Sequence, residues 1–289
     1  MPKRRHWLWS GVLASVVVAL GMMWWRDALG ERVSEIKFEL GKNIVETAEA
    51  SGVPRFRTRD IAGLVSYSVN NIPSHLPLRY AKQGYEVTWQ PVFAFTMYAD
   101  RDIHPDLKTK KIRLTLDSSG MQDAQAQAFV EATIAKFQKG KWQRYADPDY
   151  EVMLTGRSSI LDEQGNVGGD FRTIDPNYKL SPQEWRKVAR DSVMWFWVGD
   201  GVIAQLSVSN SVGMDGKDAY DMDLEFELLD VQNKRYADKL VKDLKDGDAK
   251  GWNSTAEHKA TKIKVQALNQ RLIANAIKRG DGLYVAPQR

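Results

Sequence analysis

The residues of this chain that could carry out chemistry are mostly carboxylates, because cysteine is absent and histidine is rare. The 289 residues include four histidines, far apart in the sequence: His6, His75, His104 and His258. Without cysteine there is no thiolate, disulfide or cysteine zinc site, and the His-Glu-x-x-His, phosphate-loop and Gly-x-Ser-x-Gly motifs are absent too. We therefore predict no catalytic residue, no metal site and no cofactor. Only a triad dispersed in sequence, with His75 or His104 as its base, stays open.

The densest group of acidic residues lies on one face of a predicted strand. Asp221, Asp223, Glu225 and Glu227 alternate with apolar residues, so they project from the same side at intervals of about 6.8 Å. One interpretation of this acidic row is a solvated face that keeps the sheet soluble. The other is a docking surface for a basic partner protein. Basic residues of a helix predicted to follow could instead pair with the row inside the chain: Lys234, Arg235, Lys239, Lys242 and Lys245.

Tryptophans are the other candidates for contact residues. Trp195 and Trp197 lie on one face of a predicted strand, while Phe196 and Val198 lie on the other. Because both faces are apolar, we expect one of them to be exposed, and Trp is enriched in protein interfaces. We predict that Trp195 and Trp197 contact a partner together with the acidic row.

The N-terminal segment indicates the subcellular location of these candidate residues. An uncharged run of nineteen residues, 7–25, follows Lys3-Arg4-Arg5 and ends at Arg26. As a helix it would be roughly 28 Å long, which is enough to cross the hydrocarbon core of a bilayer. Tryptophans at both ends and the preceding basic residues are typical of a spanning helix with its N-terminus inside. We predict a single-pass anchor in the bacterial inner membrane with a periplasmic C-terminal domain; a signal peptide cleaved near residue 21 is the alternative.

The positive net charge of the chain belongs to this anchor. The whole sequence has 41 basic and 37 acidic residues. Without Lys3, Arg4, Arg5 and Arg26, which flank the anchor, 37 basic and 37 acidic residues remain. The exported part is therefore neutral, and we predict no binding to nucleic acid.

Hydrophobic periodicity predicts an α+β fold, an antiparallel sheet or sheets covered on one face by helices. The predicted helices are 44–50, 60–70, 122–139, 181–191, 237–247 and 254–279, and the predicted strands are 85–89, 92–98, 112–116, 150–155, 195–198, 202–209 and 220–229. Capping boxes at Ser181/Glu184 and Ser254/Glu257, and the turn at Asp200-Gly201, are the clearest boundary signals. The predicted domains are 1–26 (cytoplasmic tail and anchor), 27–80 (connector), 81–160 (first α+β module) and 161–289 (second module).

The two modules resemble one another. Ile112, Leu114 and Leu116 correspond to Met222, Leu224 and Phe226 as the inward side of a strand, and an amphipathic helix follows each. We therefore predict two related strand–strand–helix units, with a binding groove between them.

These features predict a periplasmic protein that binds another protein and catalyses no reaction. It would be either an inhibitor or immunity protein against a periplasmic toxin, or an accessory subunit of an envelope secretion complex. The first predicts a preformed interface that survives deletion of the anchor, and the second predicts that the anchor helix itself is needed. The alternatives are an envelope-acting hydrolase and a sugar- or lipid-binding module.

Overall fold

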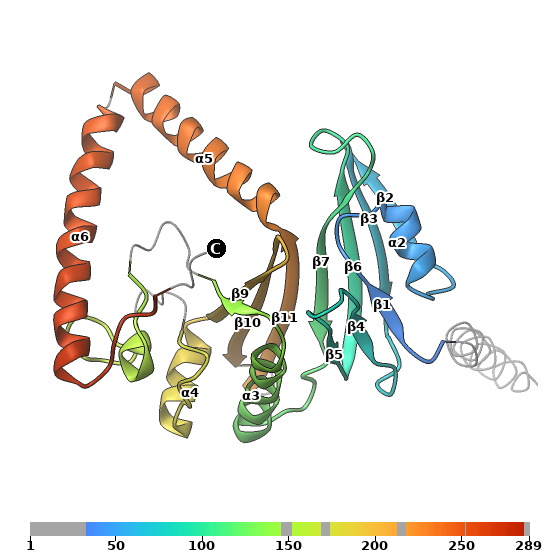
Figure 1. Ribbon diagram of the computed structural model, residues 1–289, viewed down its shortest axis with the longest axis horizontal. Coiled ribbons are helices and arrows are strands. Elements are labelled where there is room, and N and C mark those ends of the chain that lie inside the picture. Colours follow the sequence, from blue (N-terminus) through green and yellow to red (C-terminus); the bar gives the residue numbers. More distant parts are fainter. Residues whose placement is uncertain (1–32, 146–151, 169–173, 213–217, 252, 286–289) are drawn as a thin grey trace, which may run out of the picture.

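The computed structural model describes residues 33–145, 152–168, 174–212, 218–251 and 253–285. They form a mixed α+β fold with largely antiparallel sheets and, in this part of the chain, five α-helices (Figure 1). The predicted anchor, 7–25, lies outside the described residues. Of the helices that are described, none is long and apolar enough to cross a membrane.

The elements follow one another in a mixed order along the chain. The helices are α2 (Ile44–Ala50), α3 (Asp123–Lys139), α4 (Pro182–Arg190), α5 (Leu229–Ala249) and α6 (Ser254–Lys278), with a short 3-10 helix η1 (Gly156–Ile160). The strands are β1 (Ile36–Phe38), β2 (Arg57–Ile61), β3 (Leu64–Asn70), β4 (Leu78–Tyr80), β5 (Val87–Trp89), β6 (Val92–Asp100), β7 (Thr109–Leu116), β8 (Gln143–Arg144), β9 (Val193–Gly199), β10 (Val202–Val212) and β11 (Asp218–Leu228).

Eight of the strands form one antiparallel sheet in the order β2-β3-β6-β7-β11-β10-β9-β8. At its centre β7 pairs with β11, which places Leu114 opposite Leu224 and Ile112 opposite Phe226. This pairing joins strands of the first predicted module to strands of the second. Both modules therefore contribute to a single sheet.

One face of this sheet is apolar and covered by other elements. A small sheet of order β1-β4-β5 lies over it, together with α3 and α4 (Figure 1). Phe226 of β11 stacks on Tyr80 of β4, with ring centroids 5.0 Å apart, and Phe137 of α3 stacks on Trp197 of β9 at 4.1 Å. Such ring pairs stabilise the core beyond the burial of their area. The opposite face of the sheet carries mostly polar side chains.

Several predicted boundaries are confirmed by local hydrogen bonds. Ser181 accepts a hydrogen bond from the Glu184 amide at the start of α4, and the Glu184 carboxylate accepts one from the Ser181 amide in return. Asp200 and Gly201 both have positive φ (50° and 71°), as a tight turn between β9 and β10 requires. At α6 the predicted cap is wrong by one residue, because the side chain of Asn253, not of Ser254, accepts from the Ala256 amide.

The predicted helix 60–70 is wrong. The segment is a hairpin of β2 and β3, turned at Ala62-Gly63, where both residues have positive φ. The β-branched and aromatic residues Val65, Tyr67 and Val69 share one face of β3, and this period-two pattern is typical of a strand. The predicted strand 150–155 is also wrong over its described residues 152–155, where Leu154 forms only an isolated bridge with Leu283.

The strand order is symmetrical about the central β7–β11 pair. Each of these strands has its hairpin partner next to it, β6 or β10, and then β3 or β9. The helices that follow are not equivalent, because α3 packs on the apolar face whereas α5 leaves the sheet at the end of β11 (Figure 1). The relation between the two strand pairs stays a prediction.

Candidate functional site

The helices α5 and α6 form an arm that stands away from both sheets. The first has 21 residues and leads outward from β11, and the second has 25 residues and returns toward η1 (Figure 1). The buried apolar side chains of the arm lie at its ends, namely Val231 on α5 and Leu272 and Ala276 on α6. At the second end Arg271 and Asn275 also bind Glu163 of the body. The arm is therefore an arch that is held at both ends.

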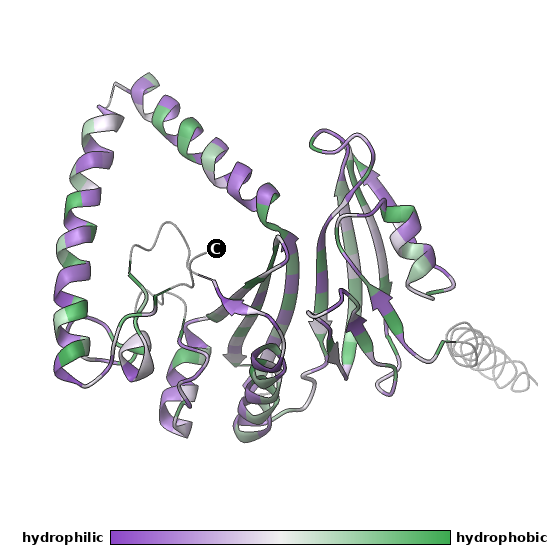
Figure 2. Cartoon of the chain, in the orientation of Figure 1, coloured by the Kyte–Doolittle hydropathy of each residue, from purple (hydrophilic) through white to green (hydrophobic). Residues whose placement is uncertain are grey.

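The middle of the arm exposes apolar side chains. Leu240 and Val241 of α5 are 45% and 50% exposed, and Ile263 of α6 is also exposed. Tyr236, Leu240 and Leu244 recur at intervals of four, so they lie on one side of α5. Hydrophobic residues recur along both helices in Figure 2. An amphipathic helix in a globular protein normally buries such a stripe. The arm therefore displays an apolar surface that no described element covers.

A groove lies between α5 and the polar face of the large sheet. It has a volume of about 610 Å³, within the range of ligand pockets. The sheet contributes Tyr98, Lys111, Arg113, Glu225 and Glu227, among other residues. From α5 it is lined by Val231, Lys234, Arg235, Asp238, Lys239 and Lys242. The groove forms because α5 begins directly after β11, so its residues 231–242 lie beside the polar face of the sheet.

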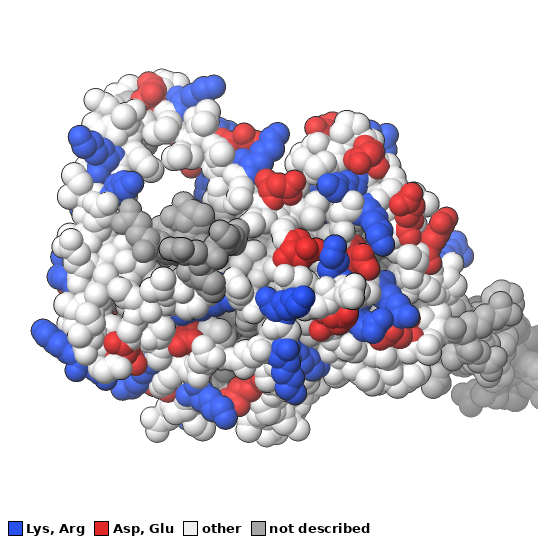
Figure 3. Space-filling view, in the orientation of Figure 1, with Lys and Arg blue, Asp and Glu red and all other residues white. Residues whose placement is uncertain are grey.

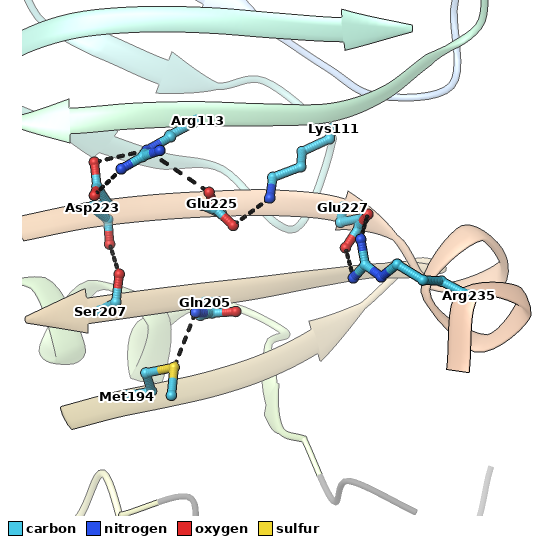
Figure 4. A network of polar contacts seen from close by, with 9 residues as sticks. All are labelled: Lys111, Arg113, Met194, Gln205, Ser207, Asp223, Glu225, Glu227 and Arg235. Atoms are coloured by element: carbon cyan, nitrogen blue, oxygen red, sulfur yellow. Dashed lines mark hydrogen bonds and ion pairs between the residues drawn. The ribbon is translucent and has the colours of Figure 1, made fainter. Parts of the chain in front are cut away.

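Two residues of the acidic row, Glu225 and Glu227, line this groove, and the row is largely paired with cations (Figure 4). Arg113 of the neighbouring strand β7 donates from Nε to the Asp223 carboxylate at 3.0 Å. Lys111 Nζ lies 2.6 Å from Glu225. Glu227, which is 7% exposed, accepts two hydrogen bonds from the guanidinium of Arg235 at 2.8 and 2.9 Å. The expected row of free negative charge is therefore neutralised within the chain, except at the exposed Asp221.

Hydrogen bonds around the groove shift the pKa of two charged groups. The hydrogen bond from Arg113 to Asp223 raises the pKa of the guanidinium. At the edge of the groove the hydrogen bond from Lys110 to Asp100 lowers the pKa of that carboxyl group. In both cases the hydrogen bond favours the charged form of the shifted group.

Three lysines of α5 face the groove without a partner. Lys234, Lys239 and Lys242 line it, and within the described parts of the chain none of them forms an ion pair. The lining contains seven basic and four acidic side chains, and it stays net positive when Asp223, which pairs with Arg113, is added. Elsewhere on the face seen in Figure 3, basic and acidic side chains are interspersed. The candidate site is thus a basic groove, the reverse of the predicted acidic surface.

Trp195 and Trp197 lie in the core, which corrects the expectation that they are exposed. Each is 2% exposed, on the covered face of β9. The strand is apolar on both sides, as predicted, but the side with Trp195 and Trp197 is the covered one. The other side carries the half-buried Phe196 and the buried Val198, which pack with Tyr145 and Ile203 in a small separate cluster.

No group of three or more His, Asp or Glu side chains within the described ranges could hold a metal ion. Asp123 accepts a hydrogen bond from the Tyr220 hydroxyl at 2.7 Å, and burial together with Asp123 raises the pKa of Tyr220 to about 12. That tyrosine accepts from Trp185 Nε1 and packs inside the core, so the contact is structural.

Lys111 and Arg113 were not predicted as members of the site. Arg113 lies in the predicted strand 112–116 and Lys111 lies just before it, in the longer observed strand β7. Pairing between β7 and β11, which are 110 residues apart, cannot be deduced from local patterns. Arg235 was foreseen as an internal partner of the acidic row, and its contact with Glu227 is confirmed.

Comparison with protein-family models, with curated proteins and with solved structures gave no match to this chain.

Proposed function

We propose that the chain is a protein-binding protein of the bacterial inner membrane that catalyses no reaction. In this proposal residues 7–25 anchor it, and the part after Arg26 is periplasmic. The uncharged run with tryptophans at both ends and basic residues before it supports the location. The neutral charge balance of the remainder argues against a role on nucleic acid.

The α5–α6 arm is the observation that carries the proposal. Long helices are stabilised mainly by packing of an apolar face, and isolated ones are marginal in water. Here the apolar residues at the middle of the arm, Leu240, Val241 and Ile263, are exposed. Exposed apolar surface next to charged residues is typical of protein interaction sites. The arm is therefore the proposed docking surface, with the basic groove beside it.

An arch held at both ends is preformed, which lowers the ordering cost of binding. This supports the first of two versions of the proposal, an inhibitor or immunity protein against a periplasmic toxin, tethered at the membrane that the toxin attacks. The second version is an accessory subunit of an envelope secretion complex. A sugar-binding module would need exposed aromatic faces, and Trp195 and Trp197 do not supply them.

Substitution on the arm tests the proposal. The full-length protein carrying Leu240→Asp and Val241→Asp is purified in mild detergent beside the wild type, and the accompanying proteins are identified by mass spectrometry. We expect a stoichiometric partner of the wild type to fall by about tenfold or more, because central apolar contacts dominate interfaces.

The matched control carries Ile61→Asp and Val212→Asp, which add the same two charges at exposed apolar positions of β2 and β10. This control variant should co-purify with as much of the partner as the wild type does. Equal loss in both variants, or no loss in either, would contradict a docking role for the arm.

A further inference from the structure

The basic groove has the charge and shape for an acidic peptide segment. Its free cations, Lys234, Lys239 and Lys242, come from one side of α5, where they recur at intervals of three to five residues. The carboxylates on the opposite wall are already occupied by Lys111, Arg113 and Arg235. A ligand in the groove therefore meets mostly positive uncompensated charge.

Asp238 is the one acidic side chain among these lysines that no described residue neutralises. It reduces the free charge of the wall but does not reverse it. Because the lysines stand over a recessed surface, their field is focused between low-dielectric walls, which favours an anionic ligand more than the same lysines on a convex surface would.

Apolar and aromatic groups line the same groove. Leu64, Ile103, Val231 and Tyr98 contribute to its wall. A small inorganic anion would leave these side chains without contact. A segment of polypeptide with carboxylates around an apolar residue satisfies both the lysines and the apolar lining, and a volume of about 610 Å³ accommodates such a segment.

We propose that the groove between α5 and the large sheet binds an acidic segment of the partner protein, with Lys234, Lys239 and Lys242 as its charge contacts. This inference rests on the proposed protein-binding function and specifies which chemistry the partner brings. The apolar stripe and the lysines lie on different sides of α5, since residues 240 and 244 are about half a turn from 242. One partner could thus hold the helix from both sides.

Peptide binding to the full-length protein in detergent tests the inference by isothermal titration calorimetry. The probe is a short peptide of alternating glutamate and serine around one leucine, and the comparison peptide has glutamine in place of each glutamate. We expect the acidic peptide to bind at least about tenfold more tightly, and to weaken as ionic strength rises to about 0.5 M.

Charge reversal locates the binding. Lys234→Glu with Lys239→Glu and Lys242→Glu should lower the affinity by about tenfold or more. The control reverses three exposed lysines of α6, Lys259, Lys264 and Lys278, and should leave the affinity unchanged. All six side chains are exposed, so we expect both variants to fold. Thermal melting verifies this.

Equal affinity for the two peptides, or equal loss in the two triple variants, would overturn the inference. The inference would also be overturned if the triple α5 variant still bound the acidic peptide but no longer bound anionic lipid vesicles. The two proposals fail separately. If the Leu240/Val241 variant loses its partner while no acidic peptide binds, the docking function stands and the acidic segment is wrong. If the acidic peptide binds while the Leu240/Val241 variant keeps its partner, the acidic segment stands and the docking role of the arm is wrong.

Discussion

Replacement of Trp197 by alanine should lower the free energy of unfolding by about 3–5 kcal/mol, as loss of a large buried aromatic side chain does. Trp197 is 2% exposed, and its ring is parallel to that of Phe137 within 5°. The substitution removes this stacking and leaves a cavity between α3 and β9. Denaturant unfolding followed by circular dichroism measures the loss.

Phe93→Ala is the matched control, because that ring is partly exposed on β6. It should cost much less, about 1 kcal/mol or below, as surface substitutions do. A Trp197→Ala protein of normal stability that has lost its partner would mean that Trp197 is a contact residue after all, and would contradict its place in the core.

Glu184→Gln should cost about 2 kcal/mol at neutral pH, since it removes charged hydrogen bonds at a buried position. The Glu184 carboxylate accepts from the amide and hydroxyl of Ser181, from Tyr178 and from Arg157. It therefore holds the start of α4 to η1 and to the loop before α4. Denaturant unfolding at several pH values measures the effect.

The pH dependence of this effect has a definite sign. Burial alone would raise the pKa of Glu184, but the hydrogen bonds from Ser181, Arg157 and Tyr178 outweigh it and lower the pKa below the usual value. The ionised group thus stabilises the fold above about pH 4.3, the unfolded value, and this contribution is lost as pH falls through the lowered folded pKa. The difference between wild type and Glu184→Gln should shrink below that pH. A difference that is constant from pH 7 to about pH 3, or one matched by the exposed control Glu49→Gln, would contradict the role of the charge.

Local signals predicted the elements that they govern directly. The capping box at Ser181, the Asp200-Gly201 turn and the alternation in 220–228 are each confirmed, because each depends on neighbours within a few residues. Residues 60–70 of the hairpin 57–70 were predicted as a helix, and Leu64, Val65 and Val69 do fit a helical spacing. The turn at Ala62-Gly63 and the pairing of β3 with β6 make the segment a hairpin and not a helix.

The candidate site was less accessible to such reasoning. Whether the acidic row is free depends on which strand lies beside β11, and this is decided by a pairing 110 residues away in sequence. Trp195 and Trp197 required a choice between two apolar faces of one strand, which the position of α3 decides. The exposed stripe of α5 could be read as amphipathic, but only the fold shows that no other described element packs against its middle.

Site-specific photo-crosslinking in intact cells tests the central claim most directly. A photoreactive amino acid is placed at position 240 of the arm, and, as controls, at the exposed positions 61 and 212. We predict one discrete crosslinked partner from position 240 and none from the controls. Crosslinks to the same protein from positions 61 or 212, with none from position 240, would contradict binding through the arm.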